Sequence, residues 1–255
     1  MNLFDLSGRI ALVTGSSRGI GYALARGLAE AGATIVLNGV SAERLAQARE
    51  RLREQFGETR VHAYAFDVTD PERVTDAVER IESGVGPIEI LVNNAALQHR
   101  QPLLDVTLED WNRVLTTDLT SAFLVGRAVA RFQIARGSGK IINVCSVQSD
   151  LARPTIAPYT AAKGGLRNLT RAMTAEWAAS GLQINGLAPG YIHTEMTQAL
   201  VDDPEFDAWL RGRAPAGRWG TPDDLVGPAV WLASDGSRYV NGQVIFIDGG
   251  MTSVV

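Results

Sequence analysis

Thr14-Gly-Ser-Ser-Arg-Gly-Ile-Gly21 decides how this 255-residue chain begins to fold. The apolar run at residues 9–13 precedes this stretch and is typical of a short buried strand. Residues 23–31 follow it with small and apolar side chains at helical spacing. The stretch therefore joins a strand to a helix at the start of a βαβ series, where a glycine-rich turn can hold phosphate.

The three glycines of this turn have separate predicted roles. They follow a G-x-x-x-G-x-G spacing, which differs from the common G-x-G-x-x-G dinucleotide fingerprint. We expect Gly15 to permit the tight turn and Gly19 to open the helix N-terminus to a pyrophosphate. Gly21 is predicted to let the helix and the strand pack closely.

Strand and helix patterns alternate along the rest of the chain without a linker. The alternation predicts one α/β domain over residues 1–255, with a doubly wound, Rossmann-type parallel sheet of about seven strands and helices on both faces. The predicted strands span residues 9–14, 33–38, 60–66, 88–93, 139–145, 183–188 and 243–247. The predicted helices span residues 19–32, 41–56, 70–83, 107–135, 157–179 and 221–234. Residues 191–220 depart from the alternation as a helical insertion.

Tyr159 and Lys163 lie four residues apart on a predicted helix and share one face of it. The ammonium of Lys163 acts to lower the pKa of the Tyr159 phenol, which could then exchange a proton with a substrate oxygen near neutral pH. Ser146, at the end of a predicted strand, could donate a hydrogen bond to the same oxygen. Such a pair is usually an ordinary surface pair, but the nucleotide-binding signature favours a catalytic site.

These motifs together resemble the short-chain dehydrogenase/reductase superfamily over essentially the whole chain. Further matches are Asn93-Asn-Ala95, Pro189-Gly190 with Thr194, and Asp67-Val68 where the family contacts adenine. The resemblance implies an enzyme with a nicotinamide cofactor, a homotetramer, and a lid over the substrate at about residues 191–220. The implied cofactor contacts are Gly15, Ser17, Arg18, Gly19, Ile20, Gly21, Asp67, Val68, Asn93, Ala95, Tyr159, Lys163, Pro189, Gly190, Ile192 and Thr194. The implied catalytic residues are Ser146, Tyr159, Lys163 and Asp118.

Three positions depart from the family pattern. Asp118 stands where the family has a catalytic Asn, whose backbone carbonyl holds a water near the catalytic Lys; an Asp keeps that carbonyl and adds a charge. Ala96 replaces the usual Gly after Asn-Asn-Ala. The second strand ends in Leu37-Asn-Gly-Val40, with neither the Asp that holds an NAD ribose nor the Arg that grips the NADP 2′-phosphate.

The cofactor preference therefore depends on few residues. Arg18 places a cation near the adenosine ribose, and Gly39 removes the acidic side chain that would repel a 2′-phosphate. Val40 withdraws a second cation. The sequence favours NADP(H), with NAD(H) also accepted.

A finer resemblance points to gluconate 5-dehydrogenases, which interconvert D-gluconate and 5-keto-D-gluconate. It is carried by Ile142-Asn-Val-Cys-Ser-Val-Gln-Ser149, Ile184-Asn-Gly-Leu-Ala-Pro-Gly-Tyr-Ile-His-Thr-Glu-Met196, Phe246-Ile-Asp-Gly-Gly250, Leu97-Gln-His-Arg100 and Pro215-Ala-Gly-Arg-Trp-Gly220. A sugar acid needs a cation for its carboxylate, and Arg100 offers a planar fork. Arg100 could instead be a solvated loop charge or a subunit contact.

Other side chains complete the expected substrate site. Gln148 and Asp150, together with Ser146 and Tyr159, could bond sugar hydroxyls; Asp150 could alternatively bind a divalent cation, although no metal site is predicted. In the lid, Glu195, Met196 and Trp209 are candidate substrate contacts, or Met196 and Trp209 only pack the lid.

Composition excludes several classes of protein. The net charge is −4 without a basic cluster, which argues against nucleic acid as a partner. The single cysteine, Cys145, is expected to be a buried thiol without a catalytic role. No apolar run is long enough to span a membrane and no signal pattern is evident, so we expect a cytoplasmic protein with a small-molecule substrate.

Two classes of alternative remain open from the sequence. A 3-oxoacyl-carrier-protein reductase, or another polyol or keto-acid reductase, shares every catalytic motif, although a carrier-protein enzyme is expected to show a basic surface. A nucleotide-sensing regulator without catalysis would be expected to lack Tyr159 or Lys163, and both are present.

Overall fold

A seven-stranded sheet forms the centre of the protein, in a computed structural model that describes residues 3–255. The strands lie in the order β3-β2-β1-β4-β5-β6-β7, and all neighbours are parallel, which confirms the predicted Rossmann-type sheet. The order reverses between β1 and β4, where ligands of such sheets bind beside the carboxyl ends of the strands. The strands are β1 (Ile10–Val13), β2 (Thr34–Gly39), β3 (Val61–Ala65), β4 (Ile88–Asn93), β5 (Gly139–Val144), β6 (Leu182–Pro189) and β7 (Val244–Ile247).

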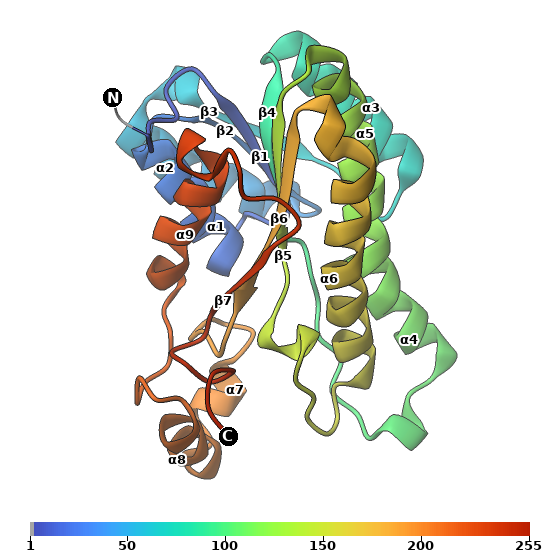
Figure 1. Cartoon of the computed structure of the whole chain (residues 1–255), viewed down its shortest axis with the longest axis vertical. Helices are drawn as coiled ribbons and strands as arrows, with labels where there is room; N and C mark the ends of the chain where they lie inside the picture. The colour runs from blue at the N-terminus through green and yellow to red at the C-terminus, as the bar shows by residue number, and fades with distance from the viewer. Residues whose placement is uncertain (1–2) are drawn as a thin grey trace.

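Helices cover both faces of the sheet, with α1, α2 and α9 on one side and α3, α5 and α6 on the other (Figure 1). Strand β1 shows why two layers are needed. Ala11 and Val13 belong to one buried cluster, and Ile10 and Leu12 belong to the other. Since successive side chains of a strand point to opposite faces, four apolar residues in a row require cover on both sides. The helices are α1 (Gly19–Glu30), α2 (Ala42–Phe56), α3 (Pro71–Gly84), α4 (Leu108–Leu115), α5 (Ser121–Arg136), α6 (Ala157–Trp177), α7 (Gln198–Val201), α8 (Pro204–Arg213) and α9 (Val226–Ala233).

The helix predicted over residues 107–135 is divided in the structure. A π-helical turn, η3 (Thr116–Thr120), separates α4 from α5. Such turns are rare and often accompany functional sites, because the widened turn changes which groups its backbone can bond. Here the turn carries Asp118, whose side chain is buried. Apolar periodicity could not predict the division, since helix continues on both sides of it.

Residues 191–220 form an excursion that is closed at its base by backbone hydrogen bonds. Gly220 N donates to the Tyr191 carbonyl, and His193 N donates to the Gly220 carbonyl, each at 2.9 Å. Helices α7 and α8 lie in this excursion, at the bottom of Figure 1. The Tyr191 and Phe206 ring centroids are 5.4 Å apart, and Trp219 packs edge-on against Tyr191 at 6.0 Å. The excursion therefore has an aromatic core of its own.

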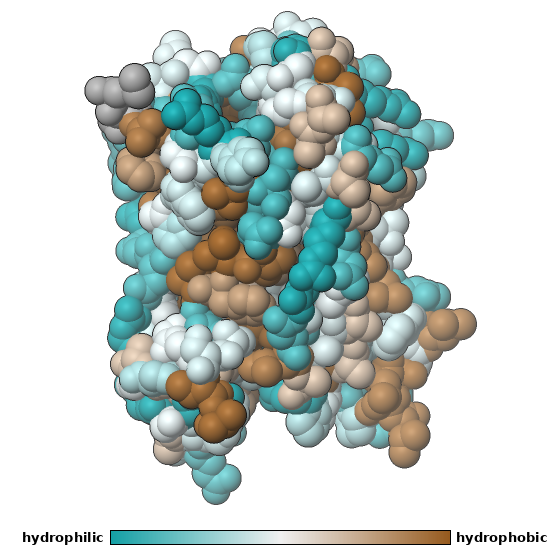
Figure 2. All heavy atoms as spheres, viewed as in Figure 1, coloured by the Kyte–Doolittle hydropathy of each residue, from teal (hydrophilic) through white to brown (hydrophobic). Residues whose placement is uncertain are grey.

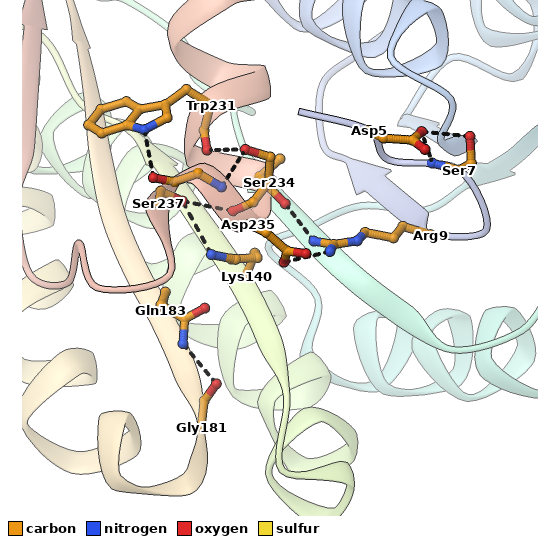
Figure 3. Close-up of polar contacts among 12 residues, drawn as sticks. Asp5, Ser7, Arg9, Lys140, Gly181, Gln183, Trp231, Ser234, Asp235 and Ser237 are labelled. Carbon is orange, nitrogen blue, oxygen red and sulfur yellow. Dashed lines mark hydrogen bonds and ion pairs between the residues drawn. The ribbon is translucent and has the colours of Figure 1, made fainter. Parts of the chain in front are cut away.

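A buried lysine lies at the opposite end of the sheet, where β5 begins. Lys140 is 6% exposed, and its Nζ donates to Ser237 Oγ at 3.2 Å (Figure 3). Beside it, Arg9 pairs with Asp235 at 2.7 Å. Burial, and then the nearby Arg9, lower the pKa of Lys140 to about 8. This group is a structural feature remote from the carboxyl ends of the strands.

The outer edge of the sheet at β7 is incompletely covered. All four β7 residues are only half-buried. Figure 2 shows apolar side chains gathered along this strand on the viewed face. No helix within residues 3–255 is both long and apolar enough to cross a membrane.

Candidate active site

A cavity of about 930 Å³ opens at the carboxyl ends of the strands. The glycine-rich turn after β1 forms one wall, and the segments at the carboxyl ends of β2, β3, β4, β5 and β6 also contribute. The excursion at residues 191–220 contributes Thr194, Glu195, Met196 and Leu200 to its mouth. Motifs distant in sequence therefore surround one space at the switch in strand order, as the fold predicts.

The glycine-rich turn has a backbone conformation and a close approach to the segment after β4 that only glycine allows. Gly15 and Gly19 adopt φ of +61° and +57°, a region that strongly favours glycine. A Cβ on Gly15 would lie 2.8 Å from Ala95 Cα. Helix α1 has no side-chain cap and no acidic residue in its first turn, so its N-terminal N–H groups can receive an anion. This cradle fits the pyrophosphate of a dinucleotide.

Gly21 has a different role from the predicted one. A Cβ there would lie 2.4 Å from Asn94 Nδ2 and 2.5 Å from the Gly15 carbonyl oxygen. Asn94 Nδ2 donates to the carbonyls of Thr14 and Gly15, at 2.9 and 3.1 Å. Gly21 therefore makes space for the Asn94 amide that secures the turn, rather than for contact between helix and strand.

The Asn-Asn-Ala motif places its two asparagines differently. Asn94 and Ala95 line the cavity, whereas Asn93 lies behind it and donates to Asn143 Oδ1 at 2.9 Å. The structure thus puts Asn94, rather than the predicted Asn93, at the cavity wall. Asn38, also missed from the sequence, lines the cavity and accepts from Gly15 N at 3.3 Å. Of the other predicted cofactor contacts, those that line the cavity are Gly15, Ser17, Arg18, Gly19, Ile20, Gly21, Asp67, Val68, Tyr159, Lys163, Pro189, Gly190, Ile192 and Thr194.

Ser146, Tyr159 and Lys163 meet at the floor of the cavity. Ser146 Oγ accepts from Gln148 N at 3.1 Å and is hydrogen-bonded to the Tyr159 hydroxyl. Lys163 Nζ donates to the Val144 carbonyl at 2.9 Å and lies 5.5 Å from the centroid of the Tyr159 ring. Serine, phenol and ammonium can therefore act on one substrate oxygen.

The pKa of Tyr159 differs from the expectation. Burial is the largest influence and raises the pKa of the phenol above its usual range, while Lys163 and Ser146 act to lower it. The predicted effect of Lys163 is present, but removal of water from the phenol outweighs it. The phenol of Tyr159 is therefore shifted toward its protonated form, in which it can donate a proton.

Asp118 lies on the far side of Lys163 from the cavity. Its Oδ1 accepts from Leu97 N at 2.8 Å, and its Oδ2 lies 3.9 Å from Lys163 Nζ without a hydrogen bond to any described residue. Burial raises the pKa of Asp118 to about 6, against the opposing charge of Lys163. Asp118 does not line the cavity, so it can act on the reaction only through its neighbours.

An ion pair spans the mouth of the cavity. Arg18 Nη1 in the glycine-rich turn contacts Glu195 Oε2 in the excursion. The two side chains are 58% and 70% exposed. Both residues line the cavity, so this pair connects the predicted phosphate side with the predicted lid.

The predicted substrate residues separate into two groups. Gln148 lines the cavity, is buried, and leaves its Oε1 without a hydrogen-bond partner. Asp150 and Arg100 do not line it: Asp150 pairs with Arg167, and Arg100 Nη2 donates to the Met196 carbonyl at 3.2 Å. Within residues 3–255, no three His, Cys, Asp or Glu side chains converge to hold a metal ion.

The side chains predicted as lid contacts likewise differ in whether they line the cavity. Met196 lines the cavity, but Trp209 does not and instead lies 6.0 Å from the Tyr191 ring and 5.1 Å from the Phe206 ring.

Cys145 is buried, and burial raises the pKa of its thiol to about 11, so it is unsuited to act as a nucleophile.

Arg153 and Tyr191 also line the cavity and were not assigned to the site from the sequence. Burial raises the pKa of Tyr191, while Arg153 acts against this effect. The only sequence signals were the position of Tyr191 directly after Pro189-Gly190 and that of Arg153 between Ser146 and Tyr159.

Comparisons with known proteins agree with this geometry. A family model described as Enoyl-(Acyl carrier protein) reductase matches residues 15–252. Gluconate 5-dehydrogenase of Gluconobacter oxydans is 55% identical over 98% of this chain and 97% of that protein. 5-keto-D-gluconate 5-reductase of Escherichia coli is 48% identical, over 100% of this chain and 99% of that one. The structure of a gluconate 5-dehydrogenase from Burkholderia cenocepacia, in complex with NADP and tartrate, superimposes with a TM-score of 0.96 at 54% identity, covering 100% of this chain and 99% of that one.

Proposed function

Since the chain belongs to the short-chain dehydrogenase/reductase family, we propose that it transfers a hydride between NADP(H) and a sugar acid, interconverting D-gluconate and 5-keto-D-gluconate. The observation that carries the proposal is the meeting of Ser146, Tyr159 and Lys163 in the cavity that also contains the phosphate cradle. The names of the two similar curated proteins supply the substrate.

The residues of this chain account for the proton and the orientation of the substrate. Ser146 Oγ and the Tyr159 hydroxyl bind the oxygen on the reacting carbon. In the direction of reduction, Tyr159 donates its proton to that oxygen as the carbonyl becomes an alcohol. Lys163 stabilises the phenolate that remains. The bound nicotinamide supplies or accepts the hydride.

Asp118 acts through Lys163, whose Nζ lies 3.9 Å from Asp118 Oδ2. In its ionised form it keeps Lys163 charged, because an opposite charge nearby favours the ammonium. The carboxylate also opposes ionisation of Tyr159. We therefore assign Asp118 a role in positioning and charge balance.

NADP(H) is the proposed cofactor on three grounds. Arg18, a cation within the glycine-rich turn, lines the cavity. Gly39 and Val40 line the cavity without an acidic group that would repel a 2′-phosphate. The Burkholderia cenocepacia relative binds NADP. NAD(H) remains an acceptable second cofactor, because β2 ends without a further basic residue.

We also propose that the enzyme assembles as a homotetramer. Half-buried β7 offers one apolar surface (Figure 2). Near α4, Leu103, Leu104 and Leu108 are 61%, 99% and 74% exposed and offer another. Two separate surfaces on each subunit suit a tetramer in which two dimers associate. Light scattering after size exclusion should give four times the 27.4 kDa chain mass; a monomer would contradict the proposal.

A substrate panel tests the proposed function. The purified protein is assayed by absorbance of the reduced cofactor with gluconate, 5-ketogluconate, other sugar acids, an acetoacetyl thioester and both nicotinamides. We expect the highest kcat/KM with gluconate or 5-ketogluconate and NADP(H). A preference for the thioester would contradict the proposal and favour the carrier-protein alternative, and no turnover of any sugar acid would sink the substrate assignment.

A further inference from the structure

We propose that Arg153 receives the carboxylate of the substrate, supported by Tyr191 and Gln148, and that it selects sugar acids over neutral polyols. The inference rests on the proposed function, because it names the residue that distinguishes an acid from an uncharged substrate at that site. It transfers the main carboxylate contact from Arg100, which does not line the cavity, to Arg153, which does.

The position of Arg153 in the chain ties it to the catalytic groups. It lies in the loop that leaves the Ser146 turn (η4, Val147–Ser149) and enters α6 just before Tyr159. The groups at both ends of the loop line the same cavity. When the reacting carbon of a substrate lies beside Ser146 and Tyr159, Arg153 therefore lines the same cavity as that substrate.

The charges of Arg153 and Arg100 also favour a carboxylate ligand. Within residues 3–255, neither Arg153 nor Arg100 has a carboxylate at ion-pair distance. Burial, and then the charge of Arg153, lower the pKa of Arg100, so the two guanidinium groups feel each other's field. The nearby Asp150 is already taken by Arg167. Two adjacent cations without an anion form a site that a carboxylate would neutralise.

The aromatic core of the 191–220 excursion positions the guanidinium. Arg153 Cζ lies 5.5 Å from the centroid of the Phe206 ring. Phe206 packs in turn against Tyr191. A planar guanidinium stacked on a ring is held in orientation, so it loses less entropy when it forms two parallel bonds to a carboxylate.

Backbone strain is concentrated in the same loop. Thr155 has φ of +71°, and it is the one non-glycine residue with positive φ in residues 3–255. A β-branched residue rarely adopts this conformation, which persists where surrounding contacts hold it and is found near functional sites. The Thr155 carbonyl accepts from Gln101 N at 2.8 Å. This bond joins the loop of Arg153 to the loop of Arg100.

Tyr191 and Gln148 line the same cavity as Arg153 and Tyr159. Tyr191 interacts with Arg153, Tyr159 and Arg100, and a hydrogen bond from Gln148 acts to lower its pKa. The buried Oε1 of Gln148 has no partner in the protein. An unpaired buried acceptor suits a substrate hydroxyl, so the site matches a polyhydroxylated chain that ends in a carboxylate.

The test compares Arg153→Ala and Arg153→Lys with wild type on gluconate and on sorbitol, the neutral polyol of equal chain length. We expect Arg153→Ala to raise KM for gluconate about ten- to a hundredfold with a small change in kcat, because a charge-assisted pair is lost. Arg153→Lys should recover only part of the affinity. Turnover of sorbitol, weak in wild type, should be nearly unchanged.

Binding measurements keep the test independent of turnover. Calorimetry of tartrate added to the NADP⁺-bound protein should show weaker binding in Arg153→Ala, whereas NADPH affinity should stay at the wild-type value. Arg51→Ala is the matched control, because the Arg51 guanidinium also lies over a ring, 4.9 Å from the Tyr22 centroid, and neither residue lines the cavity. Its KM for gluconate should not change.

The outcomes separate the two proposals. If wild type oxidises gluconate and Arg153→Ala keeps its KM, or loses activity equally on both substrates, the inference is wrong and the proposed function stands. A larger rise in KM for Arg100→Ala than for Arg153→Ala would also overturn it, by assigning the carboxylate to Arg100. If wild type turns over no sugar acid, the proposed function itself fails.

Discussion

Asp118 Oδ2 lies 3.9 Å from Lys163 Nζ, and both side chains are almost completely buried. The ammonium therefore lies close to two groups, the carboxylate of Asp118 and the phenol of Tyr159 that we propose as the proton donor. The carboxylate raises the pKa of Tyr159, and the ammonium lowers it. The charge of Asp118 should consequently change the pH dependence of the reaction.

Asp118→Asn should shift the pH profile of gluconate oxidation toward lower pH. Oxidation requires the Tyr159 phenolate, and removal of a nearby negative charge lowers the pKa of the phenol. The variant should also lack any inflection near pH 6, where Asp118 itself titrates. The measurement is kcat/KM from pH 5 to 10, with Asp76→Asn, a surface partner of Arg80, as control. Superimposable profiles would show that the Asp118 charge does not reach the phenol.

Tyr159→Phe should reduce kcat by roughly 10²–10⁴-fold, the usual contribution of general acid–base catalysis. The substitution deletes the hydroxyl that bonds Ser146 and removes little volume. NADPH affinity, measured by fluorescence titration, should change little. Retention of a third of wild-type kcat would assign the proton transfer to another group.

Arg18 and Glu195 should influence NADPH in opposite directions. Arg18→Ala removes a cation proposed to bind the 2′-phosphate and should weaken NADPH about tenfold or more, with a smaller effect on NADH. Glu195→Gln removes the carboxylate that competes for Arg18, and should tighten NADPH a few-fold, as expected for an exposed pair. The measurement is the dissociation constant of NADPH and of NADH for wild type and for both variants. Equal changes for NADPH and NADH would place Arg18 away from the 2′-phosphate.

Lys140→Met should stabilise the protein at pH 7 by at most about 3 kcal/mol, an upper bound from the lowered pKa. The folded protein binds the Lys140 proton with a pKa of about 8, below the ordinary lysine value of 10.5, so the unfolded chain binds this proton more tightly between these two pH values. Wild-type stability should therefore rise relative to the variant from pH 8 to 10.5. Urea unfolding at pH 7 and pH 10, with Arg44→Met on exposed α2 as control, measures the difference. A constant difference across this range would contradict the prediction.

The sheet and the catalytic motif could be predicted because their signals are local. Strand β1 and the glycine-rich turn are contiguous, and Tyr159 and Lys163 are one helical turn apart, so periodicity and spacing alone place them. Right-handed crossovers restrict the order of the strands to few topologies, but the order itself was seen only in the structure. The π-helical turn at Asp118 was missed, because one widened turn does not alter the apolar pattern on either side of it.

Tertiary structure alone decided which polar side chains face the cavity. Asn93 and Asn94 are adjacent, yet Asn93 bonds Asn143 on the neighbouring strand β5 and Asn94 secures the glycine-rich turn. Asp150 is taken by Arg167, while Arg153 in the same loop stays without a carboxylate partner. The side-chain direction and the charge balance of such loop residues depend on partners far away in the chain. The sequence by itself therefore determined the fold and the groups that we propose to react, and packing between distant segments decided which other side chains surround them in the cavity.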